Sequence, residues 1–264
     1  MAAYSFSSAY PTPQHARAAE RVTRFFSGQA GVEAVLLTCS CARGKASRDS
    51  CLDLAVLLPE GLAPDERARL EAAWKDEFTS HPAYAEVKAV GLYSQVEVDI
   101  RDGQFHPEGH GYTSGPDSFE LEIGNLLAYS VPLWEGGATY RRLQQAWLPY
   151  YGQDLRLQRL NMVRGFFYNN LDHIPPYIGR GLYFQAFSRF YHALGEFLQA
   201  LFISRATYPI AYDKWVREQV VEILGLPELY QDLPGLLEIA HFESDEITHK
   251  ALRLRELFDG YISA

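Results

Sequence analysis

The chain has 264 residues, of which 47% are hydrophobic and 22% are charged, and its formal net charge is −9. This length allows one large domain or two smaller ones, each with a substantial core. The acidic balance argues against a general affinity for nucleic acid, which would normally show a basic stripe. No apolar run reaches the roughly 18 residues of a membrane span, so we expect no membrane partner.

The N-terminal stretch and the cysteines indicate the cellular compartment. The first residues lack the basic region and the apolar core of a secretory signal. Cys39, Cys41 and Cys51 are the three cysteines of the chain, and they do not form a disulfide framework. We therefore predict a cytoplasmic protein with reduced thiols. A redox-sensitive thiol at Cys41 or Cys51 is left open, because thiolate character depends on local charge.

The first half of the chain alternates between helical and strand patterns. Apolar residues recur at helical spacing over 14–27, and a second helix begins at Pro64 and extends to residue 80. Strands are expected over residues 32–38, 52–58, 86–90 and 95–100. Residues 102–118 are rich in Gly, His, Pro and Ser and are expected to form a loop.

The second half shows helical spacing almost throughout. Helices are expected over residues 119–127, 139–149, 154–171, 177–203, 211–223 and 236–258. The sequence therefore predicts an α+β protein, with a mixed β-sheet flanked by helices followed by a C-terminal helical bundle. We place the two domains at residues 1–117 and 118–264.

The most informative segment connects the first two predicted strands. It contains a turn of small residues, CSCARG at positions 39–44, and a second strand that opens with SCLDL at positions 50–54. A turn of small residues after a strand leaves backbone N–H groups free to approach phosphate oxygens. Arg43 and Lys45 could add charge-assisted contacts to the same phosphates.

Acidic residues recur on the strand predicted over residues 95–100. Strict alternation places Glu97 and Asp99 together on one face of that strand. Carboxylates at positions i and i+2 of a strand point to the same side and can bind the same metal ions. The competing interpretation is a half-exposed strand whose outer face is acidic without a function.

The segment at 38–58 resembles the core of the nucleotidyltransferase superfamily. The family pattern is Gly-Ser, often followed by Ala-Arg-Gly, and then Ser-Asp-x-Asp-Leu on the next strand. Ser40, the Ala-Arg-Gly sequence at 42–44, Ser50 and the Asp-Leu pair at 53–54 match this pattern. Cys39 replaces the glycine, and Cys51 replaces the first aspartate. The resemblance implies a nucleotidyltransferase-like sheet.

The resemblance also implies roles for individual residues. Ser40 would hold a β- or γ-phosphate of the nucleotide, with further phosphate contacts from Arg43 or Lys45. Asp53 would be a catalytic metal ligand for Mg²⁺. A third carboxylate comes from a later strand in the family, and here we favour Asp99, with Glu97 as the next choice.

The helical half is similar in arrangement to the substrate-binding domain of aminoglycoside and lincosamide nucleotidyltransferases. After the long helix it contains Tyr212-Asp213-Lys214-Trp215, and by analogy Lys214 would contact the triphosphate. Glu196, in the long helix, would be the catalytic base for the acceptor hydroxyl. The alternatives are a solvent-facing lysine and a solvated or ion-paired glutamate.

Together these residues predict Mg²⁺-dependent transfer of a nucleoside monophosphate from an NTP, such as ATP, to a hydroxyl group of a small acceptor. The acceptor could be antibiotic-like. The alternative is a catalytically degenerate relative that binds a nucleotide or a protein partner without turnover, because the sulfur of Cys51 is a poor Mg²⁺ ligand. A shifted turn that brings Asp49 close to Asp53 would rescue the site. A third alternative is an unrelated α/β protein, which the topology of the sheet would reveal.

Overall fold

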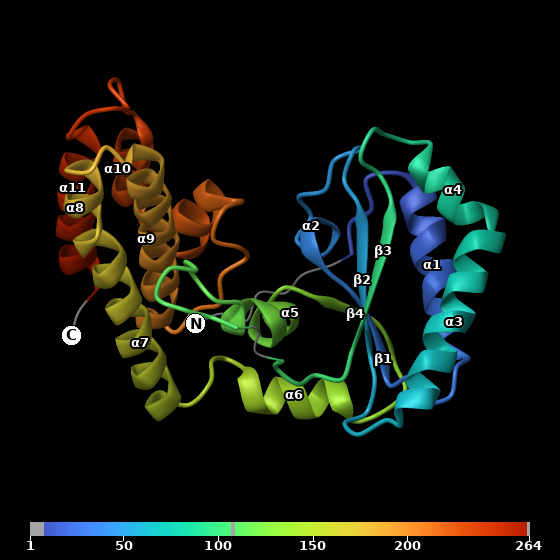
Figure 1. Ribbon diagram of the computed structural model, residues 1–264. Helices are drawn as coiled ribbons and strands as arrows, with labels where there is room; N and C mark the ends of the chain where they lie inside the picture. The colour runs from blue at the N-terminus through green and yellow to red at the C-terminus, as the bar shows by residue number, and fades with distance from the viewer. Residues whose placement is uncertain (1–7, 107–108, 263–264) are drawn as a thin grey trace. The chain divides into compact units, whose positions relative to one another are not determined.

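The computed structural model describes residues 8–106 and 109–262 (Figure 1). The chain forms two compact units. Unit 1 comprises the described residues of Met1–Phe105 together with Leu126–Leu148, and unit 2 comprises those of His106–Asn125 and Pro149–Ala264. The predicted α+β class is confirmed, with a four-stranded mixed sheet in unit 1 and helices in unit 2. The chain passes between the units three times, whereas the sequence prediction used a single boundary after residue 117.

Unit 1 is built around a sheet with the strand order β3-β2-β1-β4. The strands β2 and β3 are parallel, and β1 is antiparallel to both β2 and β4. The elements of this unit are α1 (Pro13–Ser27), β1 (Ala34–Leu37), α2 (Cys39–Ala42), β2 (Leu52–Leu57), α3 (Pro64–Ser80), α4 (Pro82–Lys88), β3 (Val96–Arg101), β4 (Val131–Glu135) and α6 (Thr139–Trp147). The short α5 (Asn125–Ala128) begins at the junction with unit 2.

The sheet of unit 1 has one face that packs against helices. Figure 1 shows α1, α3 and α4 on one side of the sheet and α2 on the other. Leu52, Leu54 and Val56 of β2 belong to the same buried cluster as Val22 and Phe26 of α1. Because side chains alternate along a strand, the residues between them point to the opposite face, which carries the candidate site.

Two predictions for unit 1 were wrong. Residues 86–90 were expected to form a strand, but they belong largely to α4. Pro82 is well placed in its first turn, and His81 Nδ1 accepts a hydrogen bond from the Ala83 backbone N–H at 3.2 Å. The strand β4 was not predicted. It contains Pro132, and proline is tolerated there because β4 is an edge strand.

Unit 2 is helical in the part of the chain that the structure describes. Its elements are η1 (Glu120–Gly124), α7 (Gln153–Asp172), α8 (Ile174–Ile178), α9 (Tyr183–Ser204), η2 (Glu218–Ile223), α10 (Pro227–Leu237) and α11 (Glu246–Tyr261). Buried Phe167, Phe190, Phe197 and Phe258 help to join α7, α9 and α11 in one core. None of the helices that the structure describes combines the length and apolar character needed to cross a bilayer.

The boundaries of several predicted helices in unit 2 also change. The helix expected over 177–203 is divided between α8 and α9, and Gly181 in the connection has a φ of +71°. The helix expected over 236–258 is divided between α10 and α11. A positive φ breaks the helical backbone path, which explains the first of these interruptions.

Candidate functional site

The turn after β1 contains two residues with a positive φ. Cys39 has a φ of +53° and Gly44 a φ of +70°, both in the left-handed region that favours glycine. The Thr38 backbone N–H donates to the Asp53 carbonyl at 3.0 Å, and the Lys45 N–H donates to the Ser40 carbonyl at 2.9 Å. The first bond fixes the turn beside β2. Cys39 therefore adopts a backbone conformation that is more favourable for glycine, the residue that it replaces in the pattern of the resemblance.

The predicted phosphate ligands differ in exposure. Ser40 and Arg43 are each 9% exposed, whereas Lys45 is exposed. All three lie in or directly after α2, within the same turn. The structure therefore brings together the three residues predicted for phosphate binding, with Lys45 the most accessible of them.

The parallel pairing of β2 and β3 decides which carboxylates are neighbours. Asp53 pairs with Glu97, and Ala55 pairs with Asp99. Directly paired residues in a sheet point to the same side, so the Asp53 and Glu97 side chains lie on one face of adjacent strands. Asp99 Oδ2 also accepts a hydrogen bond from Arg101 Nε at 2.5 Å. The register thus favours Glu97 over Asp99 as the partner of Asp53, the reverse of the order expected from sequence.

Cys51 lies two residues before Asp53 and therefore on the same face of β2. Its Sγ donates to the Tyr93 carbonyl at 3.3 Å and lies 3.9 Å from Glu97 Oε1. Burial raises the pKa of this thiol, and the charges of Asp53 and Glu97 add to the effect. Cys51 therefore presents a neutral thiol at the position where the family has its first aspartate.

Cys41 is also unsuited to a reactive role. It is fully buried, and burial, followed by the charge of Asp53, raises the pKa of its thiol to about 12. The thiolate is the nucleophilic and metal-binding form of cysteine. Because the pKa values of Cys41 and Cys51 are both raised, neither has the low-pKa environment of a redox-sensitive thiol.

Asp49, in the loop before β2, contacts the turn that precedes β3. Its Oδ1 accepts a hydrogen bond from the Leu92 backbone N–H at 3.1 Å. The adjacent Arg48 donates from Nε to the Val90 carbonyl at 2.8 Å, and the Arg48 carbonyl accepts from Ser94 Oγ at 2.7 Å. The Asp49 carboxylate thus helps to join the loop before β2 to the turn before β3, and a shift of Asp49 toward Asp53 stays a prediction.

The donor set of this face fits one magnesium ion better than two. Among the residues that the structure describes, no group of three or more His, Cys, Asp or Glu side chains is placed to hold a metal ion. Mg²⁺ in phosphate-transfer sites is often bound by one or two carboxylates together with substrate phosphates, and Asp53 and Glu97 could supply that pair. A two-metal site needs further hard oxygen ligands, and the neutral Cys51 thiol does not provide one.

Lys214 lies in unit 2, on the loop before η2. Its side chain is exposed, and the following residue, Trp215, has a φ of +56°. Gln219 holds the backbone of this loop, because its Nε2 donates to the Lys214 and Ala211 carbonyls at 2.8 Å each. The loop backbone is therefore fixed while the Lys214 ammonium group faces solvent.

Glu196 is inside the core of unit 2. It has no exposed surface, and both of its carboxyl oxygens accept from Asn170 Nδ2 at 2.9 Å. The Asn170 Oδ1 in turn accepts from Arg189 Nη1 at 2.9 Å. Burial raises the pKa of Glu196 to about 8. A general base must reach the acceptor hydroxyl, so this buried position does not suit the role predicted for Glu196.

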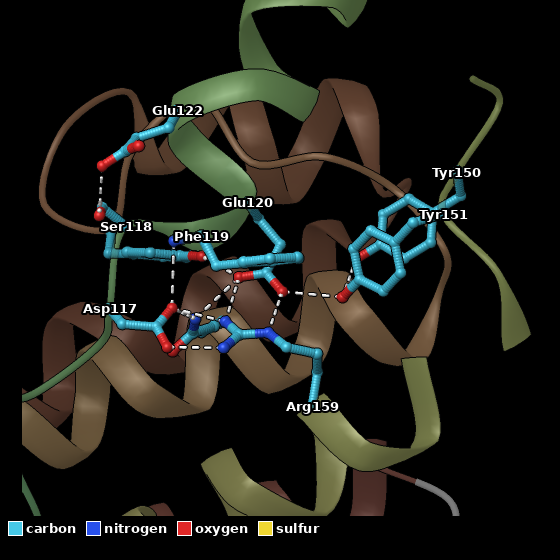
Figure 2. Close-up of polar contacts among 10 residues, drawn as sticks. Asp117, Ser118, Phe119, Glu120, Glu122, Tyr150, Tyr151 and Arg159 are labelled. Carbon is cyan, nitrogen blue, oxygen red and sulfur yellow. Dashed lines mark hydrogen bonds and ion pairs between the residues drawn. The ribbon is translucent and has the colours of Figure 1, made fainter. Parts of the chain in front are cut away.

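A buried polar network in unit 2 was missed by the sequence analysis (Figure 2). The Arg159 guanidinium of α7 donates to both Asp117 oxygens, at 2.7 and 2.5 Å, and to both Glu120 oxygens, at 2.9 and 2.8 Å. Gln199 Nε2 of α9 donates to Asp117 and Glu120 at 2.8 Å each. The Tyr151 hydroxyl donates to Glu120 Oε1 at 2.8 Å.

This network joins three separate segments of the chain. Burial alone would raise the pKa of Asp117, but the hydrogen bonds and charge of Arg159 lower it below its usual value. A guanidinium that is satisfied on every side by carboxylates and packed over the Phe119 ring at 4.4 Å is suited to a structural role. Its only sequence signal is a charged residue on the buried side of α7, which does not identify its partners.

Comparisons with known proteins complete the description of the site. The sequence matches no protein-family model and no curated protein. Among solved structures, the chain is similar to a nucleotidyltransferase-like protein from Exiguobacterium sibiricum, with 12% sequence identity and a TM-score of 0.48. The alignment covers 92% of this chain and 74% of the other. A likeness at this level assigns no activity to the present chain.

Proposed function

We propose that unit 1 binds a nucleoside triphosphate in the manner of the nucleotidyltransferase superfamily. The observation that carries this proposal is the pairing of Asp53 with Glu97 on strands next to the 39–44 turn. The turn and the carboxylates are held together by the Thr38–Asp53 backbone hydrogen bond. A phosphate-type turn and a carboxylate pair on one local framework are the two parts that nucleotide binding with Mg²⁺ requires.

The roles of the residues follow from this arrangement. Ser40 and the backbone N–H groups of the turn would hold phosphate oxygens, and Lys45 would neutralise part of their charge. Asp53 on β2 and Glu97 on β3 would hold Mg²⁺. Asp99, also on β3, would be a more distant carboxylate. When bound, the ion would stabilise the negative charge of the phosphates.

The predicted reaction is transfer of a nucleoside monophosphate to a hydroxyl group of a small acceptor. The acceptor oxygen would form a bond to the α-phosphorus as the bond to the pyrophosphate oxygen breaks; pyrophosphate would leave and the hydroxyl proton would pass to solvent. ATP is the nucleotide we would test first. We keep Lys214 as a predicted triphosphate contact, and we leave Glu196 out of the catalytic set because it has no exposed surface.

The first test is calorimetric titration of the full chain with a non-hydrolysable ATP analogue, with and without Mg²⁺. Binding that requires Mg²⁺ and weakens in D53N supports the proposal. The matched control is D76N, which removes one exposed carboxylate from α3 outside the site. Absence of binding by ATP, GTP, CTP and UTP analogues would refute nucleotide binding by this chain.

A second candidate function is nucleotide binding without turnover, and the neutral Cys51 thiol at the first aspartate position favours it. Cys51→Asp would restore a hard oxygen ligand, and we expect Mg²⁺-dependent nucleotide affinity to rise about tenfold, since a restored charged ligand contributes about 1.4 kcal/mol or more. The measurement is titration of both proteins in the presence of Mg²⁺. C51S is the control, because it changes sulfur to oxygen without adding a carboxylate.

Pyrophosphate release in the presence of a panel of hydroxyl-bearing acceptors separates the two candidates. Release by the wild-type protein identifies a transferase. Release by C51D alone identifies a nucleotide-binding protein that has lost its chemistry at position 51. If neither protein releases pyrophosphate although both bind ATP, the transferase candidate is rejected for this panel of acceptors.

A further inference from the structure

Unit 2 contains a cavity of about 530 Å³. It lies between α9, α10 and the loop before η2. Characteristic lining residues are Tyr191, His192 and Leu198 of α9, Tyr212 and Asp213 of the loop, and Leu233 of α10. All of its lining residues belong to unit 2. Its volume is within the range of sites that hold small organic molecules, roughly 300–1,000 Å³.

The walls of this cavity are mainly apolar. Leucine, valine, alanine and proline side chains form most of the surface, and three tyrosines contribute aromatic rings. No lysine or arginine is among the lining residues; Lys214 follows Asp213 in the chain without lining the cavity. A polyhydroxylated molecule would lose hydration here without gaining enough partners, so the walls favour a mainly apolar ligand.

The few polar groups of the cavity are fixed in position or available to a ligand. The Tyr212 hydroxyl donates to Glu120 Oε2 at 3.4 Å, which links this ring to the Arg159 network. His192 Nδ1 is buried and has no hydrogen-bond partner among the residues that the structure describes. Burial lowers the pKa of His192, so its imidazole is neutral at pH 7. Asp213 supplies an exposed carboxylate at the edge of the cavity.

We infer that this cavity binds a small, mainly apolar or aromatic molecule that carries one ammonium group. The apolar walls and the three tyrosine rings would hold the body of the ligand. The Asp213 carboxylate and the faces of the rings would attract the ammonium group, with no basic residue on the lining to repel it. This inference does not depend on nucleotide binding by unit 1.

The test uses three probes that share one aromatic body and differ in their polar end: phenylbutylamine, phenylbutanol and phenylbutanoate. Each is titrated calorimetrically into the full chain. We expect saturable binding of the amine, weaker binding of the alcohol by about three- to tenfold, and the weakest binding for the carboxylate. Binding of none of the three, or binding of the carboxylate as tight as that of the amine, would overturn the inference.

Two pairs of variants locate the site. Leu237 lines the cavity and is 43% exposed, so L237W narrows the entrance with little risk to folding. The matched control is L252W on α11, at a residue 54% exposed that does not line the cavity. We expect L237W to weaken amine binding at least tenfold and L252W to leave it unchanged. Equal affinity in both variants would place the probe elsewhere and reject this cavity.

The second pair tests the charge. D213N should remove the preference for the amine over the alcohol while the alcohol still binds. D76N, which makes the same change on α3 of unit 1, should retain that preference. If D213N keeps the full preference for the amine, the cavity does not recognise the ammonium group through Asp213, and the inferred ligand class is wrong.

Discussion

Unit 1 and unit 2 both bring acidic side chains together, but in opposite environments. On the sheet of unit 1, Asp53 is half-buried and Glu97 is exposed, and the thiol beside them is neutral. In unit 2, the Glu120 side chain is fully buried and that of Asp117 is 14% exposed, and both share the guanidinium of Arg159. The carboxylates of unit 2 are therefore satisfied within the protein, whereas those of unit 1 lie at an accessible face.

This difference distinguishes the candidate ligand site of unit 1 from the structural network of unit 2. Buried carboxylates need a fixed counter-charge. Removing that counter-charge strongly destabilises the folded protein, because a buried charge is left uncompensated. Carboxylates on an accessible face need no internal counter-charge, because water solvates them when no cation is bound. A cluster of acids therefore indicates a ligand site only when its surroundings leave it reachable. The predictions below test this distinction.

The largest effect is expected from removing the shared guanidinium. R159M would leave the buried Glu120 and the partly buried Asp117 without their counter-charge and should lower the free energy of unfolding by about 3–5 kcal/mol. Chemical denaturation measures this loss. The control is R253M, which removes exposed ion pairs with Glu256 on α11 and Asp232 on α10 and should cost less than about 1 kcal/mol. Similar losses in the two variants would contradict a structural role for the Arg159 network.

The next effect is a pH dependence that originates at Glu196. Burial raises its pKa in the folded protein to about 8, above the usual value of about 4.3 in the unfolded chain. The resulting contribution to stability is fully present below about pH 4 and is lost progressively as the pH rises to 8, at about 1.4 kcal/mol per pH unit.

Denaturation of wild-type protein and E196Q between pH 4 and 9 tests this expectation. E196Q should lack that part of the slope, because glutamine carries no titrating proton. E243Q, at an exposed glutamate, is the matched control and should keep the wild-type slope. A wild-type slope that survives in E196Q would show that Glu196 titrates normally.

A smaller effect should distinguish the acids of unit 1 from one another. Asp53 and Glu97 are paired across β2 and β3, whereas Asp99 lies opposite Ala55 and contacts Arg101. We expect D53N and E97Q each to weaken Mg²⁺-dependent ATP binding about tenfold, and D99N to weaken it less than about threefold. Calorimetric titration measures all three. A larger loss in D99N than in E97Q would restore the order that the sequence analysis favoured.

The smallest effect concerns the turn itself. Cys39 has a φ of +53°, which costs a non-glycine residue about 1 kcal/mol. C39G should therefore stabilise unit 1 by about 0.5–1 kcal/mol in chemical denaturation. A42G changes a residue of the same short helix that lacks a positive φ and should instead destabilise the protein. Destabilisation by C39G would mean that the thiol contributes more than the strain costs.

Local patterns were sufficient for much of unit 1. The helices α1 and α3 and the strands β1, β2 and β3 were predicted, because apolar spacing and helix-start residues are local properties. The segment 86–90 was misread because its apolar residues fit a strand as well as a helix, and Pro82 decided between them. The strand β4 was missed because its pairing with β1 depends on a partner about one hundred residues away.

The features of the site that could not be predicted depend on the pairing register of the strands and on the packing of the helices. The motif placed Ser40, Arg43 and Lys45 in one turn, and the structure has them there. The choice between Glu97 and Asp99 depended on how β3 pairs with β2, which alternation within one strand cannot determine. Glu196 was predicted as the base by analogy with related enzymes, and the sequence did not show that its carboxylate is buried and contacts Asn170 on α7.

The discontinuous division of the chain has a consequence for its synthesis. The strand β1 is complete by residue 37, yet its partner β4 begins at residue 131, after the segment that carries Asp117 and Glu120. The carboxylates of that segment form ion pairs with Arg159, which is synthesised later. During translation, unit 1 is therefore completed only after part of unit 2 has been synthesised. A chain cut after residue 117 would lack β4 and would leave one side of β1 unpaired. We expect that dividing the chain at any single position does not yield two complete folding units.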